Sequence, residues 1–189
     1  GGVEAYNYVF DGFYNETNPE WFQGSSYTHG ACAYILREGN IGQGFIQDVV
    51  HAPNYFHTAL RNRWYGQQND NFGNPQSLQT VAVHIYAPNR YNNILGNVLG
   101  TTGYHTKYEA YPASAADCDT SVFALGFGGN CGNGTVDNAA DVRTSLLRWG
   151  SYDTVNAAVR WQSSEVPTAD ANYPSSTPAT NTVPSSLFR

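Results

Sequence analysis

One asparagine recurs at the same place in several short apolar segments of this 189-residue chain. Three segments read YILREGNIG, FHTALRNRW and YNNILGNVLG, EAYNYVFDG is a weaker copy, and the aligned residues are Asn7, Asn40, Asn62 and Asn97. Asn40 and Asn62 are 22 residues apart, and the 35 residues from Asn62 to Asn97 return to that period when a polar insert at 67–79 is removed. A period of this length is typical of chains that fold as stacked repeats.

The segments between the punctuating glycines have the composition of β-strands. They are short, alternate between apolar and polar residues, and are rich in β-branched and aromatic side chains. Asparagine tolerates the left-handed conformation of a sharp corner, and its side chain can hydrogen-bond the equivalent residue one coil away. We therefore expect an all-β parallel β-helix with coils of about 22 residues and equivalent positions about 4.8 Å apart.

The alignment also predicts which side chains stack in columns. In the three better copies, the sixth residue before the asparagine is aromatic, and we expect these residues to form an internal stack. The second residue before each asparagine forms another column, which we expect to face inward, so that Glu38 would need a buried partner such as an arginine. The two columns are Tyr34, Phe56 and Tyr91, and Glu38, Leu60 and Leu95.

An ordered set of motifs resembles the right-handed parallel β-helix proteins of the pectate-lyase-like type. The motifs are THGACAYILREGNIG, FHTALRNRWYG, YNNILGNVLG and the closing TSLLRWGSYDTVNAAVRW…VPSSLF. The resemblance runs from about residue 28 to the end and implies a β-helix whose relatives act on polysaccharides or serve as phage tailspikes. Such proteins generally have more coils before this region. The chain therefore resembles the C-terminal coils of a longer β-helix, or a subunit whose open end is covered by a neighbour.

The remaining sequence divides into one domain and a tail. We expect a single β-helix domain at 1–167, with excursions at 67–79 and at 101–141, where the period breaks. The segment 168–189 is rich in Ser, Thr and Pro and is predicted to run extended along the outside or to form a cap, with its last apolar residues docked. Cys118 and Cys131 could form a disulfide worth about 3 kcal/mol in an oxidising compartment, while Cys32 is expected to be a small buried side chain.

Composition narrows the choice of partner. The net charge is -6 and Lys107 is the one lysine, which argues against nucleic acid or an anionic membrane, because both attract a basic surface. Aromatic residues make up 14% of the chain and charged residues only 13%, which favours a neutral ligand such as a glycan. We find no cysteine and histidine spacing of a metal site, so no metal or cofactor is predicted.

Two side chains of the segment FHTALRNRW are not explained by the repeat. Arg61 aligns between Gly39 and Gly96, which leaves room for its guanidinium to bind a uronate carboxylate or sugar hydroxyls. The alternative is that its aliphatic stem only covers the neighbouring strands. His57 shares that strand face and could act as a general base, although a plain surface or turn histidine is the simpler interpretation.

Asp48 completes the candidate catalytic set. Its separation from His51 is odd, so the two would lie on opposite faces of a regular strand, which weakens an Asp–His pair. We interpret the other histidines, His29, His84 and His105, as ordinary polar residues. Candidate sugar platforms, or contacts with another subunit, are Trp64, Tyr65 and Trp149.

The sequence therefore supports two functions of different classes. The first is an extracellular protein that binds or processes polysaccharide, either as a lyase or as a glycoside hydrolase, with catalysis left open. The second is a structural subunit of a fibre, sheath or virion that self-associates by stacking β-helices. Depolymerisation of a polysaccharide by a monomer, or filament formation without glycan binding, separates the two.

Arg61 allows a direct test of the glycan interpretation. The substitution Arg61→Ala should abolish binding of an acidic or neutral polysaccharide, because it removes the guanidinium that would contact the sugar. Affinity electrophoresis in a polysaccharide gel measures this. Unchanged binding by a folded variant removes Arg61 from the site.

Overall fold

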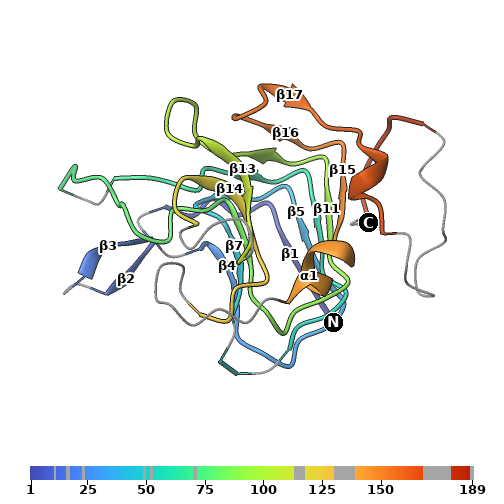
Figure 1. Cartoon of the computed structure of the whole chain (residues 1–189), viewed down its shortest axis with the longest axis horizontal. Helices are drawn as coiled ribbons and strands as arrows, with labels where there is room; N and C mark the ends of the chain where they lie inside the picture. The colour runs from blue at the N-terminus through green and yellow to red at the C-terminus, as the bar shows by residue number, and fades with distance from the viewer. Residues whose placement is uncertain are drawn as a thin grey trace.

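The structure, a computed structural model, describes residues 1–10, 12–15, 18–22, 24–48, 50–51, 53–69, 72–112, 118–129, 139–167 and 180–187 (Figure 1). These residues form three five-stranded sheets and one two-stranded sheet. The described helices are a short α-helix, α1 (Ala140–Thr144), and a 3-10 helix, η1 (Ser163–Glu165). The predicted all-β class is confirmed.

Three sheets make up the body of the molecule. Sheet 1 contains, in spatial order, β1 (Gly2–Ala5), β5 (Ile35–Glu38), β8 (Thr58–Leu60), β11 (Asn93–Leu95) and β15 (Leu147–Trp149). Sheet 2 contains β6 (Ile41–Gly42), β9 (Arg63–Trp64), β12 (Val98–Leu99), β16 (Tyr152–Asp153) and β17 (Ala158–Val159). Sheet 3 contains β4 (Ser26–Thr28), β7 (Phe45–Gln47), β10 (Val83–Ile85), β14 (Ser121–Leu125) and β13 (Lys107–Ala110).

The chain visits the three sheets in turn, and we call one passage through them a round. The second round is β5, β6 and β7, the third is β8, β9 and β10, and each strand pairs in parallel with its equivalent in the next round. The described antiparallel pairs are β16 with β17, and β2 (Phe13–Asn15) with β3 (Asn18–Phe22). In Figure 1 the β2–β3 hairpin projects from the stacked strands.

A ladder of asparagine side chains joins the rounds at the corner between sheet 1 and sheet 2. The Nδ2 of Asn7 donates to Oδ1 of Asn40 at 2.9 Å, Asn40 to Asn62 at 3.0 Å, and Asn62 to Asn97 at 2.9 Å. Each Oδ1 also accepts the backbone N–H of the asparagine before it, and Ser151 Oγ takes this role for Asn97. The predicted alignment of the four asparagines is confirmed.

Both predicted columns exist, but their orientation differs from the prediction. Tyr34, Phe56 and Tyr91 stack with ring centroids 5.1 and 5.2 Å apart, yet Tyr34 is 68% exposed, so this stack lies outside. Glu38 pairs with Leu60 in register, but the neighbouring residue Arg37 is the one that faces the core. Glu38 is buried as expected, but on the outer face of sheet 1, where Ser186 and Leu187 contact it in place of an arginine. Alternation fixes which residues share a face and not which face is inside.

The interior of the three sheets is apolar in the middle rounds and charged near both ends. In sheet 1 the inward column runs through Glu4, Arg37, Ala59, Ile94 and Arg148. It is surrounded by large buried side chains, which include Phe45, Trp64, Val83, Ile85, Leu99 and Phe123. Ala59 and Ile94 therefore occupy the apolar middle of this column, and the two arginines lie at its ends.

Each interior arginine is paired with acidic side chains. Arg37 Nε lies 3.1 Å from Glu4 Oε2, and its guanidinium sits over the Phe45 ring at 5.1 Å. Arg148 Nη1 lies 2.7 Å from Glu109 Oε2, with Glu165 at 3.7 Å from Nη2. A buried guanidinium is tolerated when carboxylates pair with it in this way.

His57 belongs to the network around Arg37 and is buried, with 1% of its surface exposed. Arg37 Nη1 can only donate, so His57 Nδ1 accepts at 3.0 Å, and Nε2 carries the proton and donates to the Cys32 carbonyl at 3.2 Å. The bond from Arg37 requires a neutral ring, because a protonated Nδ1 could not accept it. Burial, together with the charge of Arg37, lowers the pKa of His57 to about 4.

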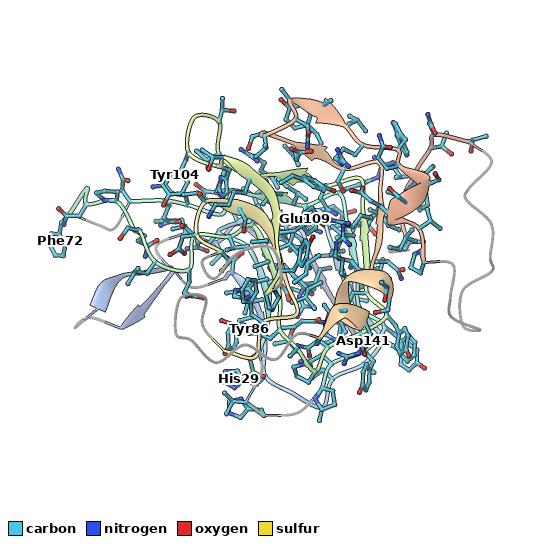
Figure 2. The ribbon with its side chains drawn as sticks, in the orientation of Figure 1. His29, Phe72, Tyr86, Tyr104, Glu109 and Asp141 are labelled. Atoms are coloured by element: carbon cyan, nitrogen blue, oxygen red, sulfur yellow. The ribbon has the colours of Figure 1, made fainter. Side chains whose placement is uncertain are left out.

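The two predicted excursions differ in character. The segment at 67–79 leaves the body between β9 and β10, and Figure 2 shows Phe72 at its tip. The range 101–141 instead contributes β13 and β14 to sheet 3.

Residues 180–187 of the predicted tail contact the body, whereas 168–179, Phe188 and Arg189 lie outside the described residues. No helix of the described ranges is long and apolar enough to cross a membrane.

The asparagine ladder should dominate the stability of the stack. Asn62→Ala removes the acceptor of the Asn40 backbone N–H and Nδ2, and takes the Nδ2 donor away from Asn97 Oδ1, so we expect a loss of about 2–4 kcal/mol in the free energy of unfolding. Asn93→Ala is the matched control, because Asn93 Nδ2 donates to Thr58 Oγ1 at a half-buried position. Urea unfolding measures both variants, and equal losses would contradict the ladder's role.

Stability should fall in mild acid because of His57. Between its ordinary pKa of 6.5 and its folded value of about 4, the unfolded chain binds a proton that the folded chain does not, so this contribution is lost as the pH falls through that window. The loss from His57 alone amounts to about 3 kcal/mol. His57→Gln preserves an acceptor and a donor without titrating, and urea unfolding from pH 7 to pH 4 should show a shallower decline. An identical decline in both proteins would rule out this role.

Candidate metal centre

Strand pairing in sheet 3 brings two potential metal ligands together. β4 of the first round pairs with β7 of the second in parallel, and Thr28 lies opposite Gln47. The next residues along the two strands, His29 and Asp48, therefore lie side by side, and the Asp48 backbone N–H donates to the Thr28 carbonyl at 3.2 Å. The two histidines and the carboxylate discussed below all lie at this edge of the molecule, where Figure 2 labels His29.

A bend after β7 adds a third ligand. β7 ends at Gln47, and the chain bends at Val50 and His51. The Asp48 carboxylate accepts the His51 backbone N–H at 3.5 Å through Oδ1, and its Oδ2 contacts His51 Nδ1. The strand-parity argument against an Asp48–His51 pair was therefore wrong, because β7 ends at Gln47 and His51 lies in a bend.

Three ligand atoms converge as a result. His29 Nδ1 lies 3.0 Å from His51 Nδ1 and 3.7 Å from Asp48 Oδ2. One ligand atom from each residue can be chosen so that all lie within 4.8 Å of one another. A tetrahedral ion with bonds of about 2.0–2.2 Å separates its ligand atoms by roughly 3.3 Å. The two distances from His29 Nδ1 bracket this value, whereas His51 Nδ1 and Asp48 Oδ2 are in direct contact and would have to move apart to admit an ion.

The carboxylate and the imidazoles differ in burial. The Asp48 side chain is 5% exposed, whereas His29 and His51 are 63% and 52% exposed. Asn89, which is fully buried, donates through Nδ2 to the Asp48 carbonyl at 2.9 Å and so fixes the backbone beneath the carboxylate. The Tyr27 ring packs edge-on against His29, with centroids 4.6 Å apart. The site is thus anchored on one side and open to solvent on the other.

This set of ligands suits a borderline transition metal. Two imidazoles and one carboxylate bind zinc or iron(II), whereas calcium and magnesium prefer oxygen ligands alone. Three protein ligands leave at least one coordination position on the solvent side. An ion held there could bind water or an external ligand and act as a Lewis acid.

The sequence contained a signal for this cluster that was missed. His29 was interpreted as an ordinary polar residue, since no ligand spacing linked it to another residue. An offset of 19 residues aligns Ser26–Tyr27–Thr28–His29 with Phe45–Ile46–Gln47–Asp48. Sequence alignment on the asparagine corner did not extend to sheet 3, whose first strands are only three residues long.

The three predicted catalytic residues are not brought together. His57 is enclosed in the Arg37 network, and Arg61 is exposed and donates to the Pro184 carbonyl at 2.9 Å. Asp48 belongs to the cluster with the two histidines. Among the described residues, no hydrogen bond or ion pair joins any two of His57, Arg61 and Asp48.

The predicted sugar platforms are covered to different degrees. Trp64 is fully buried and stacks on Phe45, and Trp149 is 4% exposed. Tyr65 is half-buried, with the Arg63 guanidinium 4.9 Å from its ring centroid. Buried indole rings cannot stack on a sugar, so Tyr65 alone keeps partial access.

Two of the three cysteines lie within the described residues. Cys118 is fully buried and disulfide-bonded, Cys131 lies outside the described residues, and Cys32 is a free, half-buried thiol.

Comparison of the chain with protein-family models, with curated proteins and with solved structures finds no match.

Proposed function

We propose that this chain is a right-handed parallel β-helix protein that binds a divalent transition-metal ion through His29, Asp48 and His51. The β-helix is supported by the passage of the chain through three sheets in turn, with parallel pairing between rounds. The handedness rests on the resemblance noted in the sequence. Metal binding is supported by the convergence of three ligand atoms from two successive rounds.

A metal ion satisfies this cluster better than a proton does. Asp48 Oδ2 only accepts while the carboxylate is ionised, and each neutral imidazole has one nitrogen without a proton. A single proton can join two of the three converging atoms, and protonation of both rings places like charges about 3 Å apart. A divalent cation attracts all three atoms at once and compensates the buried carboxylate.

The position of the cluster also gives the ion a structural role. β4 is the edge strand of sheet 3, and its described pairing partner in the sheet is β7. An ion bound to His29 after β4, and to Asp48 and His51 after β7, ties the first round to the second. Binding to the folded chain alone then stabilises it by mass action.

Glycan recognition and an extracellular location remain predictions. Trp64 and Trp149 are buried and Arg61 is engaged by the chain itself, so no described arrangement of the nominated residues favours a sugar site. The open position of the metal cluster is the better-supported place for an external ligand.

Titration with Zn²⁺ tests the proposal. We expect the metal-free chain to bind one ion per cluster at pH 7.5 by isothermal calorimetry, and the ion to raise the unfolding temperature. Affinity should fall in acid, because imidazole binds metal only without its proton. Ca²⁺ should not replace Zn²⁺, since two of the ligands are nitrogens.

Variants identify the ligands. His29→Ala and His51→Ala alter exposed side chains and should each weaken Zn²⁺ binding by at least tenfold while the chain stays folded. Asp48→Asn should do the same, and Asp141→Asn, which alters an exposed carboxylate paired with Arg90, is its matched control. Absence of Zn²⁺ binding to the unaltered chain, or full affinity in His29→Ala and His51→Ala, would overturn the proposal.

A further inference from the structure

The C-terminal segment, defined here as residues 180–187, lies across four successive rounds. Its Val183 packs at Gly150 and Gly96 of the fifth and fourth rounds, its Pro184 at Arg61 of the third, and its last residues at Glu38 of the second. Arg61, Gly96 and Gly150 each directly follow a strand of sheet 1, and Glu38 is the last residue of β5, one position earlier in the register. The segment therefore runs along the stack and not within a sheet.

Two charged side chains hold the segment, largely through its main chain. Arg61 donates to the Pro184 carbonyl through Nη2 at 2.9 Å and through Nε at 3.2 Å. The buried Glu38 carboxylate accepts the Leu187 backbone N–H at 2.9 Å and the Ser186 hydroxyl. Bonds from ionised groups to main-chain atoms are strong and favour an extended peptide over any particular side chain.

Two glycines of sheet 1's corner leave room for the Val183 side chain. Gly96 and Gly150 have φ values of +60° and +68°, and a Cβ at Gly96 would lie 3.1 Å from Val183 Cγ2. A Cβ at Gly150 would lie 2.9 Å from Val183 Cγ1 and closer still to the Trp161 ring, so a side chain at Gly150 would collide with both, and one at Gly96 would crowd the valine. The groove thus combines a size-selective notch with a cation and an anion at fixed spacing along the stack.

We propose that this corner groove, formed by Glu38, Arg61, Gly96 and Gly150, is a peptide-binding site whose occupant is the C-terminal segment, and that the segment binds without needing its covalent link. The class of ligand is an extended peptide with a small branched residue, then proline, then a hydroxyl side chain. The inference is independent of the metal centre, since none of these four residues belongs to that cluster.

The groove residues and the strands around them do not depend on the segment for their own packing and pairing. Glu38 and Arg61 are absent from the apolar core, and their contacts with the segment cross 148 and 123 positions of sequence. The strand pairing that builds the corner is complete without the segment, because Gly39, Arg61 and Gly96 donate their backbone N–H groups to Leu60, Leu95 and Trp149. A site that persists when its occupant leaves can exchange it.

Cleavage of the full chain tests the exchange. A protease recognition sequence placed within 168–179 allows the link to be cut after folding, and a fluorescent synthetic peptide of residues 180–187 is then added. We expect the cut segment to stay bound on gel filtration, and the labelled peptide to replace it with saturable kinetics. Circular dichroism checks that the body remains folded.

Matched variants give the result its specificity. Arg61→Ala should weaken the labelled peptide roughly tenfold through the loss of two hydrogen bonds, and a peptide with Ser186→Ala should also bind more weakly. Arg63→Ala is the control, because Arg63 donates to the Val98 and Gly100 carbonyls and makes no contact with the described segment. Equal affinity in Arg61→Ala and Arg63→Ala overturns the proposal, as does loss of the cut segment without peptide rebinding. Unfolding of the body on cleavage also overturns it, because the segment would then be an integral part of the fold.

Discussion

The amide-to-amide hydrogen bond between asparagines of successive rounds is the interaction on which the other features depend. At each corner the side-chain oxygen accepts both the backbone N–H and the Nδ2 of the asparagine one round before. This satisfies buried polar groups that the sheets leave unpaired, and it fixes the vertical register of the chain. A slip of one residue would leave buried donors unmatched along the whole column.

Register is what creates both proposed sites. His29 meets Asp48 because Thr28 stands opposite Gln47, and the corner groove exists because Glu38, Arg61, Gly96 and Gly150 follow one another up the stack. No single round contains a complete set of ligands or a complete groove. Parallel pairing of the short strands in a fixed register therefore brings together side chains from distant parts of the sequence.

The columns could be predicted from the sequence, whereas their orientation could not. The asparagine spacing identified Asn7, Asn40, Asn62 and Asn97, since a repeated residue type at a repeated interval carries its own alignment. Which neighbour faces the core depends on how the strand sits in the sheet, and here Arg37 faces the core with carboxylate and aromatic partners while Glu38 is buried on the opposite face, beneath residues 186 and 187. Composition alone does not show whether Arg37 or Glu38 faces the core.

The candidate sites were harder to predict for a related reason. His29 precedes the best part of the repeat, and the three-residue strands β4 and β7 offer too few positions to align by eye. The contacts of residues 180–187 follow no periodicity, because the segment crosses the rounds and does not form one. His57 was a candidate general base in the sequence, and only the arginine beside it in the structure shows why its ring must stay neutral.

The two interior arginines have a consequence for how such a stack can be lengthened. Arg37 and Arg148 close the apolar interior with ion pairs to Glu4, Glu109 and Glu165, while Ala59 and Ile94 between them form a purely apolar column. An extra round inserted between the third and fourth would continue aliphatic packing on both sides. One inserted between the first and second rounds would separate the Arg37 guanidinium from Glu4 and leave a charge in the core. The arginines thus mark the interval in which a designer can change the length of this protein.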